Sequence, residues 1–172
     1  IIVSPVNDSP TANASGNAAT PEDTFFSITV ADILTAVSAT DVDLDTLGIA
    51  VIGVDQTAGT WAVRPSGSIT LDPTNLSESQ AILLGANSVM EFTPNANDDT
   101  SSLFQFVIWD RSDGGIIDAT ADVSGRVDGD AFSQNISTLN LDITPQNDVP
   151  IAVGDVATVD EDTPAVIDVL AN

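Results

Sequence analysis

The sequence predicts an all-β fold, an antiparallel Greek-key β-sandwich, on three observations. Six short runs are rich in β-branched and aromatic residues, and several of them alternate apolar with polar side chains. Gly, Pro, Asn and Asp cluster between these runs, as expected for turns. Apolar residues make up 42% of the 172 residues, which is enough for a hydrophobic core and too many for a disordered acidic chain.

The expected strands differ in how their faces would be covered. In "LFQFVIW", Phe104, Phe106 and Ile108 share one face of a strand, whereas Val107 and Trp109 share the other. Because both faces carry large apolar side chains, we expect this strand to be covered on both sides. The six expected strands are residues 25–30, 47–54, 59–63, 88–92, 102–109 and 137–144.

Three further segments are less regular. Residues 31–38 ("ADILTAVS") and 77–84 ("SESQAILL") fit a turn or two of helix, and either also fits a strand. Residues 110–132 are rich in Asp and Gly. We expect them to form a long acidic hairpin insertion between the last two strands, with a solvated acidic loop as the alternative.

Charge is the most unusual property of the composition. The chain has 26 acidic residues and three basic ones, with a formal net charge of −23. Nucleic-acid binding is therefore not expected, since nothing neutralises phosphate, and anionic membrane surfaces are disfavoured for the same reason. Self-repulsion opposes folding unless cations relieve it. A surface that is acidic only for solubility or salt adaptation remains the alternative.

Enzymatic chemistry has little support in the residue types. The chain contains no His and no Cys, so it has neither a Ser–His–Asp nor a Cys–His arrangement, and zinc lacks nitrogen and sulfur ligands. Two carboxylates could serve a glycosidase, but close pairs arise by chance among 26 acids. We expect no enzyme, no disulfides and no membrane insertion, because no apolar run is long enough to span a bilayer.

An internal repeat organises the chain. At an offset of 140, residues 1–12 align with residues 141–152, and after a one-residue deletion "EDT" at 22–24 matches "EDT" at 161–163. Self-similarity at a fixed period predicts a tandem array. We therefore expect residues 1–6 to end one repeat, residues 7–146 to form a complete repeat and residues 147–172 to begin the next. The identical positions in the first alignment are Pro5, Asn7, Asp8, Pro10 and Ala12.

The run "DVDLD" suggests a cation site. Asp41, Asp43 and Asp45 stand at alternate positions, and in an extended loop their carboxylates would lie on one side. Such like charges repel unless a hard cation lies between them. The run is not an EF-hand, because its sixth position is Thr46 and its twelfth is Ile52. A simple turn is the alternative.

Four motifs taken in order resemble a known family. "PEDT", "DVDLD", "FVIWD" and "TPQNDVP" follow one another as in cadherin-like domains. The sequence is most similar to the tandem cadherin-like or Ig-like repeats of giant bacterial surface adhesins, of the RTX or biofilm-associated kind. The resemblance covers essentially residues 7–150.

This resemblance implies calcium, Ca²⁺, at the junctions between repeats. Carried over by motif, the ligands at the upstream junction would be Asn7, Asp8, Asp41, Asp43 and Asp110. The downstream junction would use Glu22, Asn147 and Asp148, and Glu161 would serve a junction beyond them. Pro5 and Pro145 stand where the family linker has an acid, which implies fewer calcium ions at each junction.

The resemblance also implies a function. We expect a calcium-stiffened extender repeat of a secreted or cell-surface bacterial adhesin, with neighbouring repeats of the same chain as partners. Contacts with a glycan or a cell-surface protein would come through other domains. The alternative is a carbohydrate- or protein-binding sandwich that uses Trp61 or Trp109. An exposed Trp would favour the binding module, and burial of both would favour the spacer.

Overall fold

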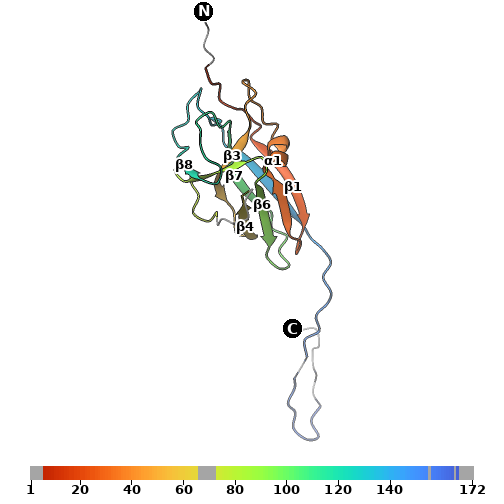
Figure 1. The fold of residues 1–172 in the computed structure, drawn as a ribbon. Coiled ribbons are helices and arrows are strands. Elements are labelled where there is room, and N and C mark those ends of the chain that lie inside the picture. The colour runs from red at the N-terminus through yellow and green to blue at the C-terminus, as the bar shows by residue number, and fades with distance from the viewer. Residues whose placement is uncertain (1–5, 66–72, 155, 165, 167–172) are drawn as a thin grey trace, which may run out of the picture.

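Strands dominate the chain. The computed structural model describes residues 6–65, 73–154, 156–164 and 166. Figure 1 shows the elements, which are β1 (Ser15–Pro21), β2 (Phe26–Thr29), α1 (Val30–Ala36), β3 (Gly48–Val54), β4 (Gly59–Arg64), β5 (Ala81–Gly85), β6 (Val89–Pro94), β7 (Ser102–Trp109), β8 (Thr120–Ala121) and β9 (Ser137–Thr144).

Two sheets form the predicted β-sandwich. The larger sheet has the order β1-β9-β7-β3-β5-β8, and the smaller has the order β2-β6-β4. From β1 to β7 the chain changes sheet at every step, which is the crossing pattern of a Greek-key sandwich. All pairs are antiparallel except β1 with β9, which is parallel.

The six expected strands are confirmed, and the two ambiguous segments are resolved differently. Residues 31–38 hold all of helix α1 except its first residue, and Thr29 caps the helix by accepting a 3.1 Å hydrogen bond from the Asp32 amide. Residues 77–84 lead into strand β5. Strand β1 was not predicted, since Thr20 is the one β-branched residue in "SGNAATP"; it forms because its backbone pairs with β9 over seven positions.

The main hydrophobic core lies between the sheets. Apolar side chains alternate along the central strands, so that one set from each strand points inward. Trp61 is 1% exposed and packs against Phe92 and Phe104, with ring centroids 4.8 and 5.0 Å away. The other large core side chains include Ile33, Ile49, Leu84, Met90, Phe106, Ile108 and Leu139.

A second core covers the outer face of the large sheet. Val107 and Trp109 of β7 point away from the main core, as the sequence predicted. The segment between β7 and β9 folds back over them and buries Val123 and Phe132 there. Gly115 permits the close approach, because a Cβ at this position would lie 2.8 Å from the Trp109 ring.

The acidic insertion is therefore more than a hairpin or a solvated loop. Its flanking strands, β7 and β9, do pair antiparallel, as in the predicted hairpin. Between them, however, the segment crosses to the far edge of the sheet, where β8 pairs with β5. Apolar residues placed among the acids drive this path, since their burial needs the outer face of the sheet.

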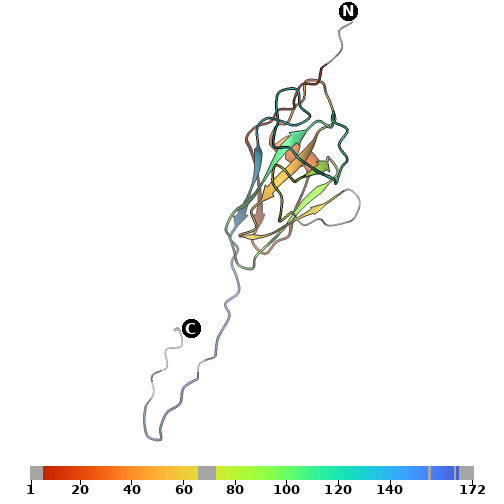
Figure 2. The same ribbon diagram turned by 90° about the vertical axis from the view of Figure 1, so that its left-hand side faces the viewer.

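The two ends of the sandwich face opposite directions. Figures 1 and 2 show residues 6–10 entering at one end, while the segment after β9 leaves from the other. We call these the entry end and the exit end. Both hydrophobic clusters lie within residues 12–143. Among the described residues, no helix has the length and apolar character needed to cross a bilayer.

Candidate metal centre

Three carboxylates gather in the loop before β3, at the entry end. One oxygen from each of Asp41, Asp43 and Asp45 lies within 4.8 Å of the others. The loop holds this shape because Oδ1 of Asp41 accepts hydrogen bonds from the amides of Asp43, at 2.8 Å, and Asp45, at 3.4 Å. Alternate spacing in an extended loop thus places the acids together, as expected.

The segment that enters the domain is fixed beside this loop. Thr11 and Thr40 exchange two backbone hydrogen bonds of 2.8 Å each, which ties the two segments together. A few residues upstream, the amide of Asp8 donates to Oδ2 of Asp43 at 2.8 Å. Backbone pairing therefore carries Asp8 to the acid loop.

Asp110 adds a buried carboxylate from a third segment. It follows β7 directly and is 2% exposed. Its Oδ1 accepts a 2.8 Å hydrogen bond from the amide of Ser112, and its Oδ2 accepts one of 3.0 Å from the side-chain amide of Asn7. Asn7 also donates to the carbonyls of Gly129 and Asp130, both at 3.3 Å.

The five residues predicted for the upstream junction thus lie at one end of the domain. Two hollows meet there and share Asp45. One, of about 370 Å³, is lined by Val6, Asn7, Asp43 and Asp45. The other, of about 410 Å³, is lined by residues around Asp45 and Asp110. Carboxylate and amide oxygens from separate segments therefore surround open space.

The donor set fits a hard cation. Carboxylate oxygens, backbone carbonyls and amide oxygens are the ligands that calcium takes in proteins. Oδ2 of Asp41 is buried without a hydrogen-bond partner, which is costly for a charged oxygen in the absence of a counter-charge. Within the described residues, no other group of three acids is as tightly spaced.

Comparison with known families gives one match, over the first part of the chain. The family model of the cadherin-like domain matches residues 6–83, from the entry segment into β5. The match supports a cadherin-like repeat. The searches of curated proteins and of solved structures found no match to the chain.

The cadherin-like match agrees with the sandwich and with the acid loop. It spans Asn7, Asp8, Glu22, Asp41 and Asp43, and it ends before Asp110. Domains of this kind are generally structural rather than enzymatic, are typically extracellular and commonly bind calcium. A role as an adhesion or structural repeat is consistent with the match.

The remaining predicted ligands lie at the exit end of the sandwich. Glu22 is 6% exposed, and its amide donates to the carbonyl of Thr144, the last residue of β9, at 2.9 Å. Its carboxylate accepts a hydrogen bond from the amide of Gln146. Asn147 and Asp148 follow directly and are exposed. The structure therefore brings Glu22 to the start of the segment that carries the other two.

The repeated "EDT" motif forms the same turn at both of its positions. Asp23 and Asp162 each have a positive φ, of 56° and 65°. In both copies the preceding Glu and this Asp occupy a turn. Asp tolerates left-handed backbone better than most residues, so the local sequence suffices to set this turn. Glu161 lies in the second of these turns and is exposed.

Neither Trp is available as a binding surface of the sandwich. Trp61 and Trp109 are 1% and 0% exposed. Their ring N–H groups donate to Ser102 Oγ at 2.8 Å and to Asp113 Oδ1 at 2.9 Å. Burial of both was the outcome expected for a spacer rather than a binding module.

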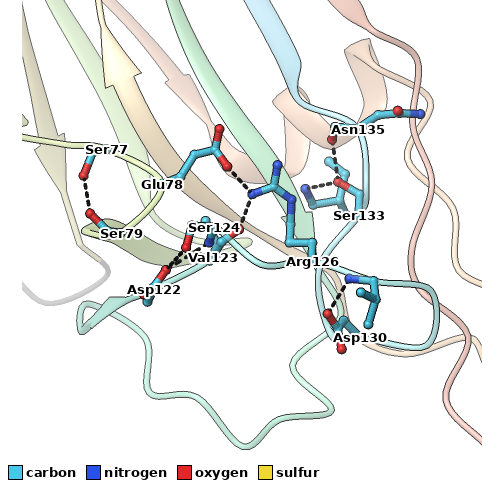
Figure 3. Close-up of polar contacts among 12 residues, drawn as sticks. Ser77, Glu78, Ser79, Asp122, Val123, Ser124, Arg126, Asp130, Ser133 and Asn135 are labelled. Atoms are coloured by element: carbon cyan, nitrogen blue, oxygen red, sulfur yellow. Dashed lines mark hydrogen bonds and ion pairs between the residues drawn. The ribbon is translucent and has the colours of Figure 1, made fainter.

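The insertion carries a hollow of its own, of about 450 Å³. Arg126 is 9% exposed at its side chain and donates to Glu78 Oε2 at 3.1 Å and to the carbonyl of Val123 (Figure 3). Its ion pair joins the insertion to the loop before β5. The hollow is lined by Asp113, Asp122, Val123, Ser124, Gly125, Arg126, Asp130, Ala131 and Phe132.

Two features of the candidate centre were absent from the predicted ligand set. Asp45 was part of the quoted acidic run but was not carried over by motif; its alternate spacing was the available signal. The carbonyls of Gly129 and Asp130 reach Asn7 through the insertion. No local pattern marks these carbonyls, because only the path of the insertion brings them there.

Proposed function

We propose that this domain is a calcium-binding extender repeat of a secreted or cell-surface bacterial adhesin, stiffened by Ca²⁺ where consecutive repeats join. The observation that carries the proposal is the meeting of three segments at the entry end. Asp8 donates to Asp43, Asn7 donates to Asp110, and Asp41 groups with Asp43 and Asp45.

Calcium would supply a positive charge and a high coordination number for oxygen ligands. Asn7, Asp8, Asp41, Asp43 and Asp110 would hold it at the entry end, with Asp45 as a further ligand. These residues come from the linker, the loop before β3 and the end of β7. A cation held by all three would restrain the linker relative to the sandwich.

The exit end would supply the other half of a junction. Glu22 is held against the segment after β9 by the Gln146 amide. With Asn147 and Asp148 of the same segment, it would complete the site shared with the following repeat. Neighbouring repeats of the same chain are therefore the expected partners.

The charge of the chain supports a dependence on cations. At a net charge of −23, a row of such domains repels itself, and bound divalent cations reduce that repulsion. Extracellular calcium modules bind with Kd values of roughly 10⁻⁴–10⁻³ M. Such an array would be stiff at extracellular calcium concentrations and bendable at cytosolic ones.

Thermal unfolding of the whole chain tests the proposal. Melting temperatures are measured by circular dichroism in EDTA, in about 5 mM calcium and in magnesium at the same concentration. We expect a rise that calcium produces and magnesium does not, reduced by Asp43→Ala. Asp142→Ala is the matched control, since Asp142 is an exposed acid on β9. Equal responses of the two variants to calcium would reject the site.

The alternative function is a carbohydrate- or protein-binding module. The hollow of about 450 Å³ on the insertion is the surface that such a module would use. With both Trp side chains buried, this surface lacks the exposed indole that sugar stacking would favour. The extender function is therefore the one that the arrangement of residues supports better.

A further inference from the structure

Large apolar side chains are exposed at both ends of the sandwich. At the entry end, Val6, Val42 and Leu44 are 79%, 79% and 89% exposed around the acid loop. Leu44 sits in the loop with φ +64°, between Asp43 and Asp45. At the exit end, Phe25 is 56% exposed in the connection from β1 to β2. The entry end thus carries a group of exposed apolar side chains, and such groups mark contact with another protein surface.

An arginine at the entry end and acids at the exit end also carry opposite charges. Arg64 pairs with Glu91 and Arg126 with Glu78. Arg111 makes no ion pair with a described residue; it lies over the Trp109 ring, 5.6 Å from its centroid, and is exposed beside Asp110. The exit end carries acids without counter-charges, including Asp23, Asp98 and Asp99. Asp23 Oδ1 accepts from the Asn97 amide at 3.1 Å, so these acids share one surface.

The length of the linker determines which surface can meet which. Strand β9 ends at Thr144, and the repeat makes Asn147 equivalent to Asn7 of the entry end. Three residues span at most about 10 Å when fully extended. In a tandem array, the exit end of one repeat therefore lies beside the entry end of the next.

We propose that the entry end, formed by Val6, Val42, Leu44 and Arg111, docks the exit end of a second copy of this repeat, with Phe25 as the inserted side chain. Phe25 would pack against Val42 and Leu44, and Arg111 would face the acids near Asp23 and Asp99. The hollow between Val6, Asn7, Asp43 and Asp45 adjoins this surface. The inference rests on the tandem array of the proposed function, and it adds an apolar contact to the shared cation.

A two-copy protein tests the contact. Residues 1–146 are followed directly by residues 7–172, so that both hydrophobic clusters of each copy stay intact and the sequence across the join is that of the natural linker up to Gln146. Only the exit end of the first copy meets the entry end of the second. The same substitution placed in the other copy is therefore a matched control.

We expect Phe25→Ala in the first copy to lower the melting temperature in 5 mM calcium by about 2–4 °C. The same change in the second copy should have no effect.

Leu44→Asn should lower the melting temperature in the second copy only; Asn tolerates the left-handed backbone at this position. The two effective changes should be non-additive when combined, since they would remove one contact. The proposed contact would be overturned if a substitution had the same effect in either copy, or if none of the substitutions had an effect.

The same experiment separates this inference from the proposed function. The melting temperature could show a calcium-specific rise that depends on Asp43, while Phe25→Ala has the same effect in both copies. That result would support the proposed function and reject the apolar contact. Copy dependence that persists in EDTA, without any calcium response, would support the contact and reject the calcium site.

Discussion

The backbone amide of Asp8 donates a 2.8 Å hydrogen bond to Oδ2 of Asp43, a residue 35 positions away. This contact makes the linker and the acid loop one unit. Since the acceptor is a carboxylate, the charge on Asp43 both holds the linker and repels Asp41 and Asp45. A change at Asp43 should therefore act differently with and without a cation.

Asp43→Asn tests this dual role. The amide oxygen of Asn still accepts from the Asp8 amide, but one negative charge leaves the cluster. In EDTA we expect a small rise in stability, of about 0.2–1 kcal/mol, as exposed charges in contact contribute this much. In calcium we expect the variant to be less stable than the parent chain. Urea unfolding in both conditions measures the change, and a shift of the same sign in both would contradict it.

Asp110 should be essential to the entry end even without a cation. Asp110→Ala removes a buried carboxylate that accepts from the Ser112 amide and from the Asn7 side chain, which would keep only its longer contacts with the carbonyls of Gly129 and Asp130. We expect a loss of about 1–3 kcal/mol in the free energy of unfolding, measured in EDTA. Asp110→Asn retains one acceptor and should lose less. A variant as stable as Asp142→Ala would show that these contacts contribute nothing.

Trp61 and Phe25 should behave oppositely in the single chain. Trp61→Ala removes a ring packed among Phe26, Phe92 and Phe104 and leaves Ser102 Oγ without its donor. We expect it to cost about 3–5 kcal/mol. Phe25→Ala is an exposed change and should stay within about 0.5 kcal/mol. Chemical denaturation compares them, and a large loss for Phe25→Ala would mean that this ring supports the domain itself.

Asp122 offers a test of the insertion by pH. The Ser124 hydroxyl, at 2.7 Å, and the Ser124 amide, at 3.0 Å, donate to Asp122 Oδ1 and hold the pKa of this carboxyl below its usual value of 3.8. A lowered folded-state pKa gives stability that is present above pH 3.8 and lost as pH falls through the folded-state value. Ser124→Ala should raise the Asp122 pKa toward its usual value, as followed by carboxyl NMR titration. An unchanged pKa would show that the hydroxyl does not hold it.

Much of the fold could be predicted from local pattern. Strand β7 begins and ends where alternation predicted, at Ser102 and Trp109, and its two faces enter the two expected environments. Strand β1 escaped prediction because it forms by pairing with β9 rather than by its own propensity. The path of the insertion also escaped, because the sheet face that Phe132 covers exists only after folding.

The candidate site also has a part that local spacing predicted and a part that it did not. The grouping of Asp41 and Asp43 follows from their spacing in one loop. The approach of Asn7 to Asp110, 103 positions apart, came from family resemblance and could not be worked out from spacing. Calcium itself, and the roles of Glu22, Asn147 and Asp148 at a junction, stay predictions.

By itself the sequence determined the sandwich class, the internal match at an offset of 140 residues and the acid loop, because alternation, turn chemistry and charge are read from neighbouring residues. Only the tertiary structure decided that linker, loop and β7 end meet at one end while Glu22 lies at the other. It also decided that both Trp side chains are buried and that Phe25 is not. These outcomes depend on contacts between distant segments, which form only when the two sheets pack and β9 pairs with β1.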